Sequence, residues 1–329
     1  MDSTLTETKF NPSVHIRAAT TDRVQSDLEE ITVCICTYRR PELLKRLLDA
    51  LAIQRTEGQF TFCCAIVDND GEASAQPIIE SFRSGSPLIV RYVVEPTRNF
   101  AVVRNRALGL VSGKLLAFID DDEVPQEDWL LQLWRTMQEY QADAVLGPVR
   151  PYFERDPPAW IVKGRICERQ AHPTGTKIHW SQTRTGNVLL RAAIATECGI
   201  NFDPAFGSGG EDVDFFKRAA GAGKSFVWCE EAPAYELVPE ARLTRRYHLK
   251  RALLQGSVSS KYAAEKSSFF STFKVASKAL VAAIAYSLAL PFLFLAGDHI
   301  GMKFLIKDCH HIARLLAIFR LRQSARRDF

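Results

Sequence analysis

Short apolar runs alternate with amphipathic stretches over the first 140 residues. The predicted strands are residues 31–37, 60–70, 88–96 and 114–122. The predicted helices are residues 41–54, 77–84, 99–113 and 125–140. The apolar runs are rich in β-branched residues and end in polar ones, whereas the stretches between them carry apolar residues at helical spacing. Pro125 is predicted in the first turn of the last helix, followed by Glu127 and Asp128. This alternation predicts an α/β fold, a mainly parallel sheet with helices on both faces.

The pattern changes after residue 141. Residues 142–151 are predicted to form a strand, whereas residues 151–186 are irregular and contain several prolines and glycines. Regular secondary structure is predicted again at residues 186–195 and 215–223. Between them lies a loop rich in glycine and acidic residues, residues 201–214, which includes the sequence Gly-Gly-Glu-Asp.

The C-terminal part contains residues 279–297, a stretch of 19 residues without a charge. At 1.5 Å per residue a helix of that length spans roughly 28 Å, close to the thickness of a bilayer's hydrocarbon core. Lysines precede the stretch and arginines follow it, which disfavours a single span under the positive-inside tendency. We therefore expect a re-entrant hairpin, with Pro291 turning the chain back, or helices lying in the plane of the membrane. A buried helix of a soluble domain is the alternative.

Composition narrows the class of protein. The chain has 329 residues, 47% of them hydrophobic and 24% charged, which is typical of a globular protein. A net charge of +4 is too small to indicate a nucleic-acid partner. Basic clusters at residues 242–251 and 320–327 indicate an anionic surface nearby, either lipid headgroups or phosphates. Among the eight cysteines, the strand pairs Cys34/Cys36 and Cys63/Cys64 lack the Cys-x-x-Cys spacing of zinc or redox sites and are predicted to be buried apolar thiols, which fits a reducing compartment.

Three domains are predicted from these patterns. Residues 1–30 are polar and lack the apolar core of a signal peptide, so we expect a mobile leader on a cytosolic protein. Residues 31–240 form the α/β domain, and residues 241–329 form a helical, membrane-associated region.

Polar residues follow the predicted strands, where α/β sheets bind their ligands. No Gly-x-Gly-x-x-Gly or P-loop motif follows any strand, which disfavours those nucleotide sites. Asp120, Asp121, Asp122 and Glu123 stand in a row after the fourth strand. These like charges repel one another unless a cation lies among them, and Mg²⁺ or Mn²⁺ prefers such oxygen ligands. On an extended backbone Asp120 and Asp122 would share a face and Asp121 would point away. A helix-capping role for Asp122 or Glu123 is the alternative.

Six stretches, in order, resemble the family 2 glycosyltransferases with the GT-A fold, most of all those of the bacterial exopolysaccharide and succinoglycan type. They are VCICTYRRPELLKRLLDAL, AIVDND, EPTRNFAVVRNRAL, LLAFIDDDEVP, TGNVLLR and FDPAFGSGGEDVDFFKRAAGAG. They cover about residues 31–230.

The resemblance implies a nucleotide-sugar site at the ends of the first strands. Thr37, Tyr38 and Arg39 would border the nucleotide, and Asp68 would recognise the edge of the base. The family often has a second aspartate after Asp68, but this chain has Asn69, which leaves uridine, guanosine and thymidine open.

The resemblance also implies the reaction centre. Arg104 would lie near the diphosphate and Asp120 near the ribose, while Asp122 would bind Mn²⁺ or Mg²⁺. Gly209 and Gly210 would lie on the acceptor side.

Two further acids complete the implied centre. Glu211 and Asp212 would be the catalytic pair, with Asp212 as the base. Alternatively Asp212 and Asp214 are first-turn helix residues with only capping and dipole roles, and Glu211 only orients its neighbour or is solvated.

The implied activity is inverting transfer of a hexose from a nucleotide diphosphate sugar, with UDP-sugars favoured, to a lipid-linked saccharide in surface polysaccharide biosynthesis. The enzyme would act at the cytoplasmic face of the bacterial inner membrane as a peripheral or monotopic protein. The chemistry is consistent with this, because one base and a neutralised diphosphate suffice for a direct displacement. A sugar-phosphate nucleotidyltransferase and a non-catalytic scaffold of a polysaccharide assembly are the alternatives.

Overall fold

The computed structural model describes residues 28–207, 209–265 and 269–325. Most of the predicted leader, residues 1–27, lies outside the described part of the chain. The chain divides into two compact units. The first contains Met1–Arg150 and Arg169–Glu236, and the second contains Pro151–Glu168 and Leu237–Phe329. The second unit thus begins near the predicted boundary at 241 and also takes in part of the irregular segment.

The first unit is built on a seven-stranded sheet with the order β3-β2-β1-β4-β8-β6-β9. Its strands are β1 (Glu29–Thr37), β2 (Phe60–Asp68), β3 (Val90–Val94), β4 (Leu115–Phe118), β6 (Ala144–Leu146), β8 (Val188–Arg191) and β9 (Phe226–Trp228). β8 runs antiparallel to both of its neighbours, whereas β1 is parallel to β2 and β4, β2 to β3, and β6 to β9. The mainly parallel sheet is therefore confirmed.

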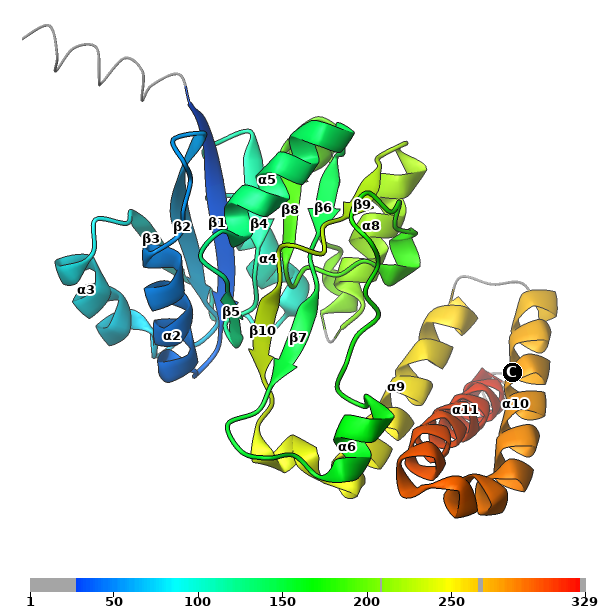
Figure 1. The fold of residues 1–329 in the computed structure, drawn as a ribbon. Coiled ribbons are helices and arrows are strands. Elements are labelled where there is room, and N and C mark those ends of the chain that lie inside the picture. The colour runs from blue at the N-terminus through cyan, green and yellow to red at the C-terminus, as the bar shows by residue number, and fades with distance from the viewer. Residues whose placement is uncertain (1–27, 208, 266–268, 326–329) are drawn as a thin grey trace, which may run out of the picture. The chain divides into compact units, whose positions relative to one another are not determined.

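Helices cover both faces of this sheet (Figure 1). One face packs against α2 (Pro41–Ala52), α3 (Gln76–Gly85) and α5 (Trp129–Tyr140), and the other against α4 (Phe100–Leu108), α7 (Ala193–Thr196) and α8 (Glu211–Gly221). Alternation along β1 explains why both faces are apolar. Ile31, Val33 and Ile35 enter the first core, and Cys34 enters the second.

The predicted helix over 125–140 begins four residues late, at Trp129. Pro125 is instead the last residue of β5 (Glu123–Pro125), which lies at the edge of a three-stranded sheet with β10 (Ala234–Leu237) and β7 (Val149–Tyr152). An edge strand tolerates proline because the missing N–H is not required by a second neighbour. The predicted strand over 142–151 is likewise two strands, β6 and β7, in different sheets.

The second unit is helical. It contains α6 (Ala159–Gly164), a 3-10 helix (Glu240–Leu243), α9 (Arg245–Glu265), α10 (Phe269–Ala296) and α11 (Asp298–Ala325). α11 packs against α6, α9 and α10. Gly256 allows the close approach of α9 to α11, because a Cβ there would lie 2.2 Å from the carbonyl oxygen of His310.

The predicted reversal at Pro291 is wrong. α10 continues through Pro291 to Ala296, and the chain turns at Gly297, whose φ is +152°. A proline inside a helix removes one backbone donor and need not end the helix. Glycine adopts the left-handed side of φ without the steric cost of a side chain, so the turn forms there.

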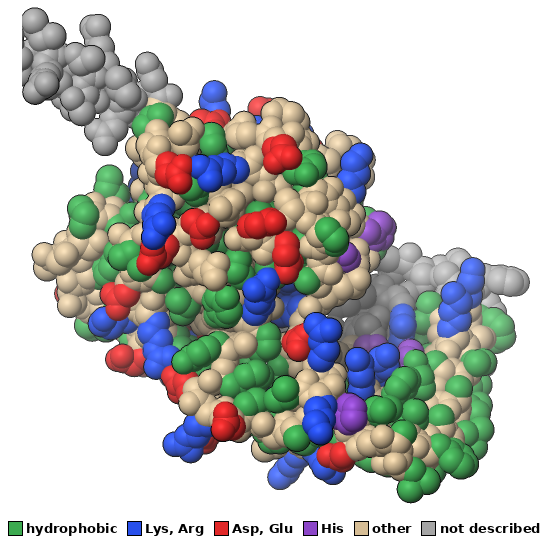
Figure 2. All heavy atoms as spheres, in the orientation of Figure 1, with side chains coloured by type: hydrophobic (Ala, Val, Ile, Leu, Met, Phe, Trp, Pro, Cys, Tyr) green, Lys and Arg blue, Asp and Glu red, His purple; other side chains and the backbone are tan. Residues whose placement is uncertain are grey.

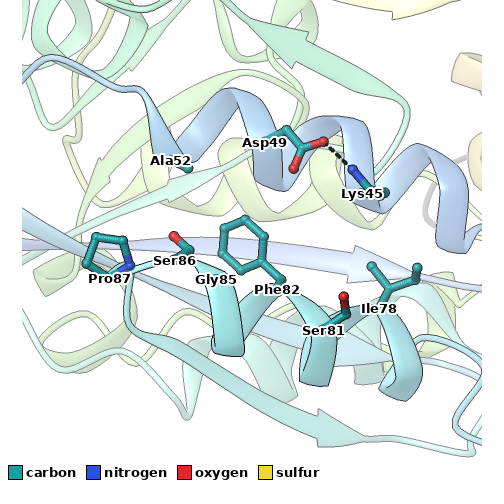
Figure 3. Close-up of a pocket in the computed structure, with 9 residues that line it drawn as sticks. All are labelled: Lys45, Asp49, Ala52, Ile78, Ser81, Phe82, Gly85, Ser86 and Pro87. Atoms are coloured by element: carbon teal, nitrogen blue, oxygen red, sulfur yellow. Dashed lines mark hydrogen bonds and ion pairs between the residues drawn. The ribbon is translucent and has the colours of Figure 1, made fainter.

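A shallow groove of about 380 Å³ lies between α2 and α3 (Figure 3). Ile78 and Phe82 line it from α3, and the ion pair between Lys45 and Asp49 lies on α2 (Figure 3). The groove shares no residue with the predicted site.

Candidate active site

The predicted site residues meet at the carboxyl ends of β1, β2 and β4. Thr37 ends β1, Asp68 ends β2, and Asp120 follows the paired strand β4. The start of α8 approaches the same edge through Glu211, which is bonded to Arg104 of α4. Segments as far apart in the chain as Thr37 and Glu211 therefore contribute to one site.

The acidic segment forms a turn. The N–H of Glu123 donates to the carbonyl of Asp120 at 3.1 Å, so Asp121 and Asp122 are the central residues of that turn. Thr37 Oγ1 donates to Asp121 at 2.8 Å. Arg40 Nη1 donates to Asp121 at 3.0 Å and to Asp122 at 3.1 Å. The prediction that Asp121 points away from Asp122 is therefore wrong, because the backbone bends where extended geometry was assumed.

The capping alternative for these acids is also wrong, since α5 begins at Trp129 with Asp128 at its N-cap position. Arg40 partly neutralises the row of four acidic residues 120–123. It is a protein cation placed against two of the four carboxylates.

Asp120 and Glu123 are the first and last residues of the acidic turn, and both side chains approach Gly186. Glu123 is fully buried, and its Oε2 accepts from the N–H of Asp120 at 3.3 Å. Its Oε1 is buried and has no hydrogen-bond partner among the described residues. A Cβ at Gly186 would lie 2.7 Å from Glu123 Oε1 and 3.0 Å from Asp120 Oδ2. Glycine at this position thus leaves two carboxylate oxygens facing bare backbone.

Burial sets the protonation of these acids. It raises the pKa of Glu123 well above its usual range, and the charge of Asp120 raises it further. Burial, followed by the charges of Asp120 and Asp121, raises the pKa of Asp122 to about 6. A divalent cation near these groups would favour their charged forms.

Arg104 connects the acidic turn to the glycine-flanked acids. Its Nη1 donates to Glu211 Oε1, and its Nη2 lies 3.8 Å from Asp120 Oδ1. The Arg104 side chain is only 15% exposed and that of Glu211 only 5%. Burial raises the pKa of Glu211, and the charge of Arg104 opposes this shift. Glu211 is therefore buried and paired, which excludes the alternative that it is merely solvated.

Two asparagines hold α4 against the segment that leads to α8. Asn99 caps α4 by accepting from the N–H groups of Ala101 and Val102, and its Nδ2 donates to the carbonyl of Pro204. Asn105 bonds both backbone groups of Phe202. These contacts explain why Arg104 reaches Glu211 across more than 100 residues of sequence.

The two glycines before α8 have left-handed backbones, with φ of +127° at Gly209 and +93° at Gly210. Residues with a side chain rarely adopt such values, so glycine is favoured at both positions that lead into α8. Asp212 lies in the first turn of α8 and is partly exposed. Within the described chain its carboxylate accepts one hydrogen bond, from the N–H of Val213. The first-turn location named in the alternative is thus correct, and the role of Asp212 as base stays a prediction.

Asp68 has a structural environment. It is 0% exposed, and its oxygens accept from the N–H groups of Asp70 and Ala75 and from the hydroxyl of Tyr92. These contacts stabilise the turn after β2, and the carboxylate does not face outward. The assignment of Asp68 to base recognition stays a prediction.

Tyr38 and Arg39 lie nearer the surface. The guanidinium of Arg98 lies 4.9 Å from the centre of the Tyr38 ring, and that of Arg39 lies 5.5 Å from it. Arg39 has a φ of +52° and binds Asp70 through two hydrogen bonds of 2.9 and 3.1 Å. Asp70, not Asp68, is therefore the acid of this segment that contacts the predicted nucleotide-side residues.

The donors fit a Mg²⁺ or Mn²⁺ ion that uses substrate oxygens as well. The described residues contain no group of three His, Cys, Asp or Glu side chains able to hold a metal. Mg²⁺ is commonly bound by one or two carboxylates plus phosphates, so a small acidic set suffices. Asp120 Oδ2 and the unpartnered Oε1 of Glu123 converge near Gly186, while Asp122 lies against Arg40. The ligand role of Asp122 stays a prediction.

Sequence reasoning missed Arg40, Asp70 and Glu123 as members of the site. Arg40 and Asp70 lie within the quoted stretches VCICTYRRPELLKRLLDAL and AIVDND, so the motifs themselves were an available signal. Glu123 was noticed as an acid, but only the structure shows that it is fully buried.

Comparison with known proteins identifies the family of this chain. Residues 32–198 match the family model for glycosyl transferase family 2. The chain is 37% identical to the succinoglycan biosynthesis protein ExoM of Rhizobium meliloti (strain 1021) over 240 residues, which cover 72% of this chain and 76% of that protein.

Solved structures share the fold at low identity. The mannosyltransferase PcManGT from Pyrobaculum calidifontis, in complex with GDP-Man and Mn²⁺, has a TM-score of 0.60 and 15% identity, with 93% of this chain and 94% of that chain covered. S. aureus TarS 1-349 in complex with UDP-GlcNAc has a TM-score of 0.52 and 16% identity, with 90% and 92% covered. The expected GT-A-like α/β fold is confirmed. The matched family model and the identity to ExoM show that the chain belongs to glycosyl transferase family 2.

Proposed function

We propose that this glycosyltransferase moves a hexose, with inversion, from a nucleotide diphosphate sugar to a lipid-linked saccharide in surface polysaccharide biosynthesis. One observation carries the proposal. Arg104 pairs with Glu211 and lies 3.8 Å from Asp120, so the acidic turn and the glycine-flanked acids form a single centre. A donor held at the turn would present its sugar toward the start of α8.

The donor side combines cationic and acidic groups suited to a nucleotide diphosphate. A divalent ion held by Asp120 and by Asp122 or Glu123 would neutralise negative charge on the leaving diphosphate. Arg104 adds a fixed positive charge beside it. Solved relatives of this fold carry GDP-Man with Mn²⁺ or UDP-GlcNAc, which supports a nucleotide-sugar donor. UDP-sugars are favoured by the resemblance, with GDP- and dTDP-sugars as the alternatives.

Asp212 is the proposed base. It removes the proton from the acceptor hydroxyl as that oxygen attacks the sugar carbon and the diphosphate leaves. Glu211, held by Arg104, positions the first turn of α8 that carries Asp212. A single displacement inverts the configuration and needs no covalent intermediate.

Asp212→Asn tests this role. It should lower transfer by about 10³-fold while nucleotide binding stays near wild type, because the amide cannot accept the proton. Asp214→Asn is the matched control, since Asp214 shares the first turn but is bonded to Arg218. Transfer by the Asp212 variant at the wild-type rate would remove it as the base. Release of pyrophosphate, in place of a nucleoside diphosphate, would indicate the nucleotidyltransferase alternative.

The second proposed partner is the inner leaflet of the bacterial membrane. Within Phe273–Ala296 of α10, an 18-residue window has a mean hydropathy of 2.2, and only 11% of that window is buried. Leu280, Ile284, Leu288, Phe292 and Leu295 recur at helical spacing and are half or more exposed. Figure 2 shows hydrophobic side chains gathered along this helix. An exposed stripe of this kind is poorly suited to water and well suited to the acyl boundary of a leaflet.

The alternative of a buried soluble helix does not fit that exposure. The α10–α11 hairpin would instead lie on or partly enter the cytoplasmic leaflet, near a lipid-linked acceptor. Leu288→Glu with Phe292→Glu should abolish flotation with vesicles that contain anionic lipid, because charged residues disfavour the acyl region. Ile53→Glu, at an exposed apolar residue of the first unit, should float like wild type. Unchanged flotation of the double variant would refute this surface.

A further inference from the structure

Arg184 is a partly buried cation with buried donor atoms that make no hydrogen bond to the described residues. It lies between the 3-10 helix Trp180–Gln182 and β8. Its Nε and Nη2 atoms are buried, and neither has a hydrogen-bond partner within the described residues. Other buried arginines of this unit differ, since Arg104 donates to Glu211. Burying N–H donors without hydrogen bonds lowers the stability of the folded protein. The two donor atoms of Arg184 therefore require an explanation.

The surroundings place Arg184 on the Asp120 side of the active site. Its guanidinium carbon lies 5.9 Å from the centre of the buried Trp228 ring. Burial lowers the pKa of Arg184 to about 10, the charge of Arg169 lowers it further, and the charges of Glu123 and Asp120 oppose the shift. Gly186, two residues further along the chain, approaches the oxygens of Glu123 and Asp120, so Arg184 belongs to the segment beside both carboxylates and makes no hydrogen bond to either in the described chain.

Arg169 does not share this condition. Its Nη2 is bonded to Glu236 of β10. Arg184 is thus the cation of this pair whose Nε and Nη2 have no partner within the described residues, and its guanidinium lies against the ring of Trp228. The next residues strengthen the positioning, because Asn187 is fully buried and bonds Trp129 and the carbonyls of Pro148 and Ala232.

The geometry points to Arg184 as a binding residue for a phosphate group of a substrate. This inference rests on the proposed glycosyl transfer and adds a residue to it. A guanidinium offers parallel N–H donors that match two phosphate oxygens, and such charge-assisted contacts are stronger than neutral hydrogen bonds. The phosphate can belong to the nucleotide diphosphate of the donor or to the lipid diphosphate of the acceptor.

Stability of the free protein separates a ligand-binding arginine from a packing one. Arg184→Met keeps the stem over Trp228 and removes the unpaired charge. The free variant should therefore melt higher than wild type, by about 2 °C or more. Arg191→Met is the matched control at the other end of β8. Arg191 Nε donates to the carbonyl of Ala142, so its loss should lower the melting temperature. A lower melting temperature for Arg184→Met would show a structural role and overturn the inference.

Binding identifies the source of the phosphate. Isothermal titration of full-length protein with Mn²⁺ compares UDP, GDP and farnesyl diphosphate, the last as a short lipid-diphosphate probe. Arg184→Gln should weaken one probe class by about tenfold or more, and Arg184→Lys should restore part of the affinity. Loss for UDP or GDP assigns the donor phosphate, and loss for farnesyl diphosphate alone assigns the acceptor phosphate. Wild-type affinity for all three probes would overturn the inference.

The same titrations distinguish failure of the proposed glycosyl transfer from failure of the role of Arg184. Wild-type protein that binds none of the nucleoside diphosphates would contradict the proposed glycosyl transfer itself. Wild-type binding that Arg184→Gln leaves unchanged would contradict only the role of Arg184.

Discussion

Two arginines contact the acidic turn, and they differ in burial. Arg104 is 15% exposed and joins α4 to Glu211 of α8 and to Asp120 after β4. Arg40 is 44% exposed and pairs with Asp121 and Asp122. Both arginines reach partners far along the chain, 107 positions from Arg104 to Glu211 and 81 from Arg40 to Asp121, so sequence separation does not distinguish the two pairs. The difference is that both side chains of the Arg104–Glu211 pair are largely buried, whereas Arg40 is half-exposed.

The largest expected effect comes from breaking the buried pair. Arg104→Met leaves Glu211 without its cation in a buried position, so the free energy of unfolding should fall by about 3–5 kcal/mol. Urea denaturation measures the change, with Arg40→Met as the exposed counterpart. Equal losses in the two variants would show that burial does not distinguish the two arginines.

Removal of divalent metal tests the acidic turn as a whole. Chelation with EDTA should lower transfer by about 100-fold or more, because the leaving diphosphate loses its neutralising ion. Added Mn²⁺ or Mg²⁺ should restore activity, and the Asp212→Asn variant should keep its metal-dependent nucleotide binding. Full activity after thorough chelation would mean that the arginines alone neutralise the diphosphate.

A smaller effect is expected from a methyl group added at Gly186, beside Glu123 and Asp120. Gly186→Ala should weaken metal-dependent nucleotide binding by about tenfold, since the new Cβ would approach the oxygens of Glu123 and Asp120. Gly221→Ala is the control, because nothing lies within 4 Å of its Cβ position. Titration calorimetry with Mn²⁺ and UDP compares the two, and equal affinities would place the metal away from Gly186.

The smallest expected effect belongs to Arg40 itself. Arg40→Met should destabilise the protein by about 1 kcal/mol or less, because half-exposed ion pairs contribute little. It should also lower the Mn²⁺ concentration needed for half-maximal transfer by about twofold to threefold, as two carboxylates lose a competing cation. A higher Mn²⁺ requirement would instead show that Arg40 orients the metal ligands.

Local patterns of sequence predicted much of the fold. The alternation in β1 and the helical spacing in α2 depend on residues close together in the chain, and both elements form as expected. Pro125 misled because a proline suits both a helix start and an edge strand, and only the distant β10 decides between them. The GT-A-like expectation came from the order of motifs, not from periodicity.

The site was harder to predict because its contacts join distant residues. The motif acids were found, but the bond between Arg104 and Glu211 spans 107 positions, and Arg184 has no motif of its own. Burial also decides roles that residue type leaves open. Asp68 and Asp212 are both motif aspartates, yet one is enclosed by hydrogen bonds and the other is partly open.

Asn187 has a consequence for redesign of the enzyme. With a left-handed φ of +56° and a side chain bonded to three other segments, it fixes the loop that contains Gly186 independently of the residues before position 183. Sequence changes in the irregular stretch 169–182 should therefore leave the backbone beside the acids in place.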